Sequence, residues 1–185
     1  MASPRYAPAG LLVSHGRHRV VIDGGTTAPR SIDAWLVTDA RCELIASIRR
    51  LSRERDIECG VTRFEASGLV IAPHPVVHTS HPAFGYTIET AHARVVWAPE
   101  FFEFPKWAAR ADLMFAEAAS YSRPIHFRGN VGGHMSALSV AREAKRHHVQ
   151  RLVFAHIGRS SIRARDAKAE LPFGEWGRDG QRFVI

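Results

Sequence analysis

The stretch AWLVTDARCELIASIRRL, residues 34–51, decides the fold because its hydrophobic pattern changes within a few positions. Residues 34–38 form a short apolar run, which predicts a buried strand. Leu44, Ile45, Ile48 and Leu51 then recur at helical spacing, which predicts a helix directly after the strand. The stretch therefore predicts a strand, a polar turn and a helix in close succession.

Regular elements are also predicted on both sides of this stretch. Upstream, residues 11–14 and 19–23 predict a hairpin, with a glycine in its turn. Downstream, residues 136–148 carry an apolar stripe typical of a helix, and residues 151–156 predict a buried strand. Strands that alternate with helices predict an α/β chain. The other predicted elements are strands at 61–64, 69–72, 86–89, 94–98 and 113–116, helical turns at 105–110, and a final edge strand at 181–185.

Composition indicates a globular protein with a basic surface. A chain of 185 residues with 45% hydrophobic residues can bury one sizeable core, so we expect a single domain over residues 1–185. The formal charge of +7 favours a polyanionic partner, either nucleic acid or a small anionic substrate, because a basic surface concentrates anions. A basic protein without such a partner is the alternative, and the oligomeric state is left open.

Targeting and cysteine patterns favour the cytoplasm. The apolar run at residues 9–13 is too short for a signal peptide, and no segment reaches membrane-spanning length. Cys42 and Cys59 are too few for a disulfide framework and lack the spacing of a Cys-x-x-Cys motif. We therefore expect a protein of the reducing cytoplasm that does not bind membranes.

Three short segments with histidine lie near predicted strand ends, namely Val77-His78-Thr79, Gly133-His134-Met135-Ser136 and Phe154-Ala155-His156-Ile157. Glu100 follows the predicted strand at residues 94–98. Together with residues 20–25 and the stretch at 34–51, these segments resemble the metallo-β-lactamase superfamily, in its ribonuclease Z and phosphodiesterase-like branch. The resemblance covers about residues 10 to 159, and it is carried by the pattern of strands and these short motifs.

This resemblance implies a fold and a set of site residues. The fold is a four-layer αββα sandwich, with helices outside two packed sheets. His78, Glu100 and His156 fall where the family places metal ligands, and Glu100 stands in place of an aspartate. His134 falls where the nuclease branch has a histidine near the scissile phosphate, so the resemblance implies a catalytic role for it.

The family's first metal motif, His-x-His-x-Asp-His, is replaced in this chain. The corresponding residues are Asp39, Arg41, Glu43 and Leu44, and a leucine cannot bind a metal. The remaining ligand sets are rich in oxygen, which favours Mn²⁺, Mg²⁺ or Fe²⁺ over the zinc of a three-histidine site. These sets are Asp39, His78 and Glu100 around one position, and Glu43, Glu100 and His156 around the other.

Arg41 supports a competing interpretation of the same cleft. A permanent cation close to a divalent ion is unfavourable unless carboxylates screen it. Arg41 could instead fill the metal space and pair with Asp39, Glu43 or Glu100, so that an ion pair replaces the metal network. We expect its guanidinium to lie in the cleft.

Two functions therefore remain open at this point. The first is a divergent hydrolase of a phosphodiester or another small anionic ester, with one divalent ion (Mn, Fe or Zn) and with His134 as the proton donor. The second is a catalytically silent binding or regulatory protein of the same fold, with no metal and with Arg41 in the cleft. The residues leave open whether the protein is an enzyme, and they do not define its substrate or pathway.

Overall fold

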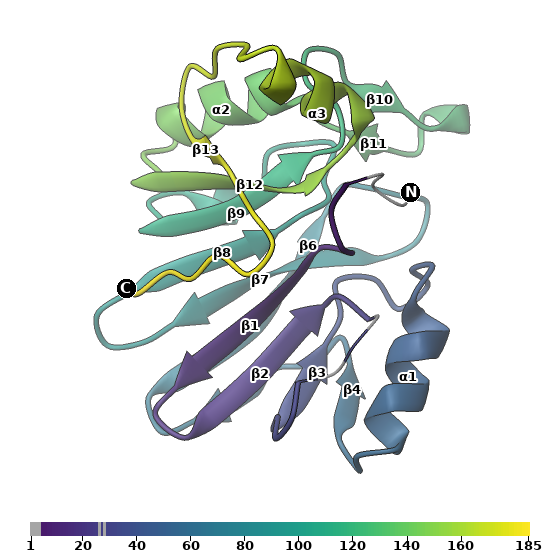
Figure 1. Ribbon diagram of the computed structural model, residues 1–185, viewed down its shortest axis with the longest axis vertical. Coiled ribbons are helices and arrows are strands. Elements are labelled where there is room, and N and C mark those ends of the chain that lie inside the picture. The colour runs from purple at the N-terminus through teal and green to yellow at the C-terminus, as the bar shows by residue number, and fades with distance from the viewer. Residues whose placement is uncertain (1–4, 26, 28) are drawn as a thin grey trace.

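The computed structural model describes residues 5–25, 27 and 29–185, and its first sheet is built from the amino-terminal third of the chain. Its strand order is β1-β2-β3-β4, in which β1 and β2 form the predicted hairpin and the other pairs are parallel. Helix α1 (Ile45–Arg53) lies beside this sheet (Figure 1). The strands are β1 (Gly10–His15), β2 (His18–Asp23), β3 (Ala34–Leu36) and β4 (Glu58–Gly60).

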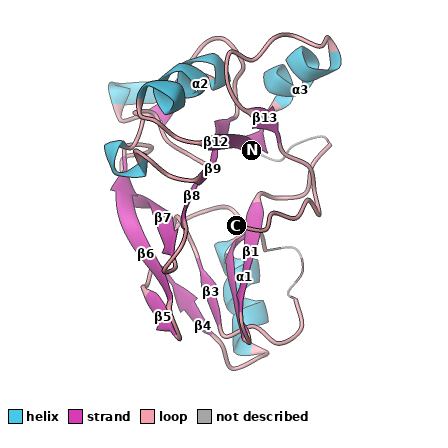
Figure 2. Cartoon of the chain, turned by 90° about the vertical axis from the view of Figure 1, so that its left-hand side faces the viewer, coloured by secondary structure: helices cyan, strands magenta, loops and turns pink. Residues whose placement is uncertain are grey.

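The second sheet has the order β13-β12-β9-β8-β7-β6-β5. Helices α2 (Ala137–Arg146) and α3 (Arg159–Asp166) lie at the opposite end of the molecule from α1 (Figure 2). No helix in the described part of the chain is long and apolar enough to cross a membrane. The strands are β5 (Phe64–Ala66), β6 (Leu69–Val76), β7 (Ala83–Glu89), β8 (Arg94–Ala98), β9 (Leu113–Ala118), β12 (Arg151–Ile157) and β13 (Glu175–Trp176).

The side chains of the central strands in the second sheet alternate between two hydrophobic cores, one on each face of the sheet. In β8, Val95 and Trp97 pack toward the first sheet, whereas Val96 and Ala98 join the cluster beneath α2. The same alternation continues through β9. Because successive side chains of a strand point to opposite faces, a continuous apolar run is what a sheet covered on both faces requires.

The first sheet is covered on both faces in the same way. Val20 and Ile22 of β2 lie in the core between the sheets, while Val21 packs with Trp35 and with Ile48 of α1. The order of layers is therefore helix, sheet, sheet, helix. The structure confirms the predicted four-layer αββα sandwich.

Two predicted strands are wrong in detail. Residues 61–63 are not a strand, because β4 ends at Gly60 in the first sheet and β5 begins at Phe64 in the second. Residues 181–185 form no strand, and the edge position is held by β13 at Glu175–Trp176. The helix predicted at 136–148 is confirmed as α2, and the Ser136 hydroxyl caps it by accepting the N–H of Ser139.

Candidate metal centre

Three ionisable side chains stand at one edge of the second sheet. Strands β8, β9 and β12 are parallel neighbours, so their carboxyl ends meet at the same edge. Glu100 follows β8, Glu117 lies near the end of β9, and His156 lies near the end of β12. The second sheet therefore gathers two carboxylates and an imidazole from segments that are distant in sequence.

His78 and His134 reach the same place from outside these strands. His78 follows β6, and His134 ends β11 (Gly133–His134), which pairs with β10 (Ile125–His126). The backbone N–H of Gly133 donates to the His78 carbonyl (2.8 Å), and Nδ1 of His78 lies 2.9 Å from the Gly133 carbonyl oxygen. These two contacts tie the histidine segments together.

Glycine is required where these segments meet. A Cβ atom on Gly132 would lie 2.2 Å from the His78 carbonyl oxygen, and one on Gly133 would lie 1.8 Å from the Ile125 carbonyl oxygen. Such distances are far inside van der Waals contact. The Gly132-Gly133 pair therefore allows the backbone to approach closely enough to place His134 beside His78.

The four residues implied by the resemblance at strand ends come together. Nε2 of His78 lies 3.6 Å from Oε2 of Glu100, and Nε2 of His156 lies 3.2 Å from Oε1 of the same residue. The ring of His134 lies between the other two imidazoles, with centroids 4.7 Å from His78 and 5.4 Å from His156. Glu100 and the three histidines thus form one cluster.

Glu117 also belongs to this cluster, although no sequence motif marks it. Its side chain is fully buried, and its carboxylate accepts the N–H groups of Ala119 (2.6 Å) and Phe101 (3.2 Å) and the Nδ1–H of His134 (2.7 Å). Burial alone would raise its pKa, but His134 and His156 lower it to about 2. The sequence signal that could have found Glu117 is its place as a lone acid at the carboxyl end of the apolar strand β9.

His156 sits between the two carboxylates. Burial opposes its charged form, but Glu117 and Glu100 outweigh this effect and raise the pKa of His156 to about 9. Its Nδ1 is buried 3.5 Å from Oε1 of Glu117 and has no hydrogen-bond partner within the described residues. His156 also has a φ of +36°, an uncommon angle for a residue with a side chain.

The residues of the replaced motif lie outside the cluster. Asp39 is buried and accepts the Arg41 backbone N–H (2.7 Å) and bonds to Nε2 of His81 (2.9 Å). Glu43 is exposed, and Leu44 precedes α1 and packs beside it. Neither Asp39 nor Glu43 joins a described group with the spacing of metal ligands.

The ion pair predicted for Arg41 is absent among the described residues, and the place of its guanidinium in the cleft stays a prediction. The residue is exposed, and its guanidinium pairs with none of Asp39, Glu43 and Glu100 among the residues that the structure describes. The physical reason is that Asp39 is already satisfied by a turn N–H and by His81. Arg41 therefore does not replace a metal by pairing with these carboxylates.

Two overlapping groups could hold a metal. Their ligand atoms lie within 4.8 Å of one another in each group. His134 belongs to both, so the described residues offer room for one ion more readily than for two. The first group is His78, Glu100 and His134, and the second is Glu117, His134 and His156.

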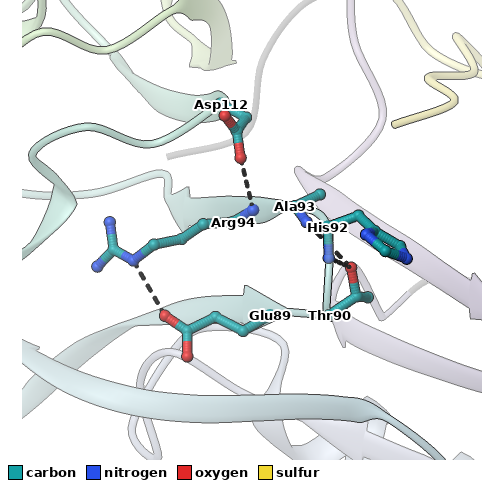
Figure 3. A pocket seen from close by; sticks show the side chains of 6 residues that line it. All are labelled: Glu89, Thr90, His92, Ala93, Arg94 and Asp112. Atoms are coloured by element: carbon teal, nitrogen blue, oxygen red, sulfur yellow. Dashed lines mark hydrogen bonds and ion pairs between the residues drawn. The ribbon is translucent and has the colours of Figure 1, made fainter.

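A pocket at the β7–β8 turn is separate from this cluster (Figure 3). It lies at the amino end of β8, whereas Glu100 follows the carboxyl end. Its acids are already engaged, since Glu89 pairs with the Arg94 guanidinium (3.0 Å) and Asp112 accepts the Arg94 N–H (2.7 Å). The pocket therefore offers little free charge to a ligand.

Comparison with known proteins gives matches to structures. No protein-family model and no curated protein sequence matches the chain. The metallo-β-lactamase fold protein YhfI from Bacillus subtilis has a TM-score of 0.70 at 18% identity, covering 95% of this chain and 89% of its own. Zn²⁺-bound PqqB from Methylobacterium extorquens gives 0.62 at 15% identity, covering 95% and 87%. Human tRNase Z, short form, gives 0.58 at 13% identity, covering 85% and 90%.

Proposed function

Because the chain has the metallo-β-lactamase fold, we propose that it is a hydrolase of a phosphodiester or another small anionic ester, with a metal site that has fewer ligands than the family's two-metal centre. The observation that carries this proposal is the convergence of Glu100 with three histidines at strand ends. Two similar structures support the proposal by analogy. PqqB binds Zn²⁺, which supports a metal site, and human tRNase Z is an RNase, which supports a phosphodiester substrate.

The residues present fit a divalent ion. Nδ1 of His78 faces a carbonyl oxygen, which can only accept, so this nitrogen carries a proton and, in the neutral ring, Nε2 is the atom with the lone pair. Glu100 places one carboxylate oxygen near that atom. Nδ1 of His156 faces Glu117 at 3.5 Å, so this ring is a further proton donor in the same cluster. When bound, a divalent ion supplies an activated water and polarises the ester.

The protein's own groups would bind and orient the substrate around this site. The formal charge of +7 draws anions toward the molecule. The raised pKa of His156 keeps a positive charge beside Glu100 at neutral pH. His134 and His156 are the two imidazoles available to hold a proton for the leaving oxygen.

Glu100→Gln tests the proposal, because it removes the carboxylate that lies between His78 and His156. We expect loss of bound metal and of turnover of bis(p-nitrophenyl) phosphate, both measured on purified protein. Glu103→Gln is the matched control, since Glu103 is an exposed acid of the same loop, and it should retain both properties. Turnover that survives both EDTA and Glu100→Gln would place the chemistry elsewhere.

One observation favours the silent alternative. The His156 cation already lies near two carboxylates, Glu100 and Glu117, so the cluster neutralises part of its own charge. A buried ion-pair network of this kind can serve a structural role without a metal. Under this alternative, the purified protein would contain no stoichiometric metal and show no turnover, and Glu100→Gln would change only its stability.

A further inference from the structure

The three ligand atoms of His78, Glu100 and His134 lie within 4.8 Å of one another. Small side-chain rotations would bring them onto one ion, with bonds of about 2.0–2.2 Å to nitrogen and oxygen. His78 is almost fully buried, while His134 and Glu100 are partly exposed. The position is therefore enclosed by protein on one side and open on the other.

Hydrogen bonds already orient both histidines of this group. Histidines that bind metals almost always donate their second ring N–H to a backbone carbonyl or a carboxylate. His78 directs Nδ1 to the Gly133 carbonyl (2.9 Å), and His134 directs Nδ1 to Glu117 (2.7 Å). In each ring, Nε2 remains as the atom that can coordinate an ion.

Glu117 is an orienting group in this arrangement. Its carboxylate is occupied by two backbone N–H groups, from Phe101 and Ala119, in addition to His134. Coordination of an ion by Glu117 would have to disturb these bonds at a fully buried position. This favours the group that contains Glu100 over the group in which Glu117 itself is a ligand.

An aromatic wall supports the same position. The ring of Phe127 contacts both imidazoles, with centroids 5.5 Å from His78 and 5.3 Å from His134. The N–H of Phe127 bonds to the Gly132 carbonyl, which fixes this wall to the hairpin that carries His134. An apolar wall restricts the motion of the two rings and limits access of water from that side.

We infer that His134 is a metal ligand, and that one ion binds to His78, Glu100 and His134 in place of the site lost with the replaced motif. This inference rests on the proposed function and assigns its metal position. Two imidazoles and one carboxylate, with an open position, form a donor set typical of catalytic zinc. The role of proton donor then passes from His134 to His156, the remaining imidazole of the cluster.

Zn²⁺ and Co²⁺ binding to the intact chain, freed of metal by a chelator, tests this assignment. Titration calorimetry gives the Zn²⁺ stoichiometry and affinity, and visible absorption of Co²⁺ reports the ligand set. We expect one ion in the wild type and none in His134→Ala. Glu117→Gln should keep the site but weaken Zn²⁺ affinity by about 10- to 100-fold, the usual effect of losing an orienting partner.

His126→Ala is the matched control, because His126 is an exposed histidine on the facing strand of the same hairpin. It should bind one ion with unchanged affinity and an unchanged Co²⁺ spectrum. Circular dichroism and thermal unfolding would establish that each variant is folded. Asp39→Asn should also keep the ion, since Asp39 bonds to His81 outside the cluster.

The outcomes separate this inference from the proposed function. One ion in the wild type that persists with the same Co²⁺ spectrum in His134→Ala would overturn the inference and leave a metal-dependent hydrolase standing. Loss of the ion in Asp39→Asn but not in His134→Ala would also overturn the inference, because it would show that the ion binds at Asp39. No ion in the wild type would overturn both.

Discussion

At the scale of single residues, Asp23 shows how the strand ends are held in place. Its carboxylate accepts the N–H and hydroxyl of Thr38 and the indole N–H of Trp97. It thereby joins the end of β2 to the loop after β3 and to β8. These partners of Asp23 could not be predicted from the sequence, because Thr38 and Trp97 are distant from it along the chain.

Asp23 should also impose a pH dependence on stability. Burial outweighs its hydrogen bonds and raises its pKa from 3.8 to about 6. The folded state therefore holds the Asp23 proton more tightly than the unfolded state, and this proton stabilises the fold. The stabilisation is complete below pH 3.8 and is lost as the pH rises through about 6. The difference is on the order of 3 kcal/mol in the free energy of unfolding.

Asp23→Asn isolates this effect, because asparagine does not titrate. The free energy of unfolding of the wild type minus that of Asp23→Asn should be larger at about pH 4 than at about pH 7. Denaturant unfolding at both pH values measures it. A difference that is constant with pH, or that increases toward neutral pH, would show that the carboxyl group is not perturbed in this direction.

Part of the candidate site could be predicted from the sequence, and part could not. The convergence of His78, Glu100, His134 and His156 could be predicted because each lies in a short segment that resembles a family motif at a strand end. Glu117 was missed because an acid in the apolar segment 113–118 gives no sign that its carboxylate turns inward onto histidines. The partners of Asp39 could not be predicted, since they are a turn N–H from Arg41 and the side chain of His81.

At the scale of elements, the β10–β11 hairpin decides where His134 lies. Gly133 has a φ of +155°, and a Cβ atom there would overlap the Ile125 carbonyl oxygen of the facing strand. Gly133→Ala should therefore break the pairing of β10 with β11 and lower the free energy of unfolding by about 2 kcal/mol or more. Thermal unfolding measures this loss.

Gly129→Ala is the matched control in the same hairpin. Gly129 also has a positive φ (+74°), but its nearest neighbour to an added Cβ is 3.7 Å away, which is ordinary contact. It should cost only the backbone strain of about 1 kcal/mol. Equal stability of the two alanine variants would contradict the claim that close packing at Gly133 fixes His134.

Element boundaries were predictable where hydrophobic periodicity and capping agree. The helix α2 has both an apolar stripe and a serine cap, and its prediction was close. Residues 61–64 have a β-like composition, but periodicity cannot show that the chain passes from one sheet to the other there. Residues 181–185 contain Phe183, which packs between the sheets without joining a strand ladder.

At the scale of the whole molecule, the two sheets serve different purposes. The second sheet supplies Glu100, Glu117 and His156 from parallel strand ends, whereas the first sheet packs against its inner face. In the first sheet, residues 34–51 form the predicted strand, turn and helix. Their apolar side chains, rather than any metal ligand, build the core there.

The central claim is that one ion binds at the cluster in place of the replaced motif. The most direct measurement is an anomalous difference map at the zinc absorption edge, from crystals of the protein grown with Zn²⁺. We predict a single peak bonded to His78, Glu100 and His134, with Glu117 hydrogen-bonded behind His134. A peak bonded to Asp39 or Glu43, or no peak within reach of His134, would contradict the account.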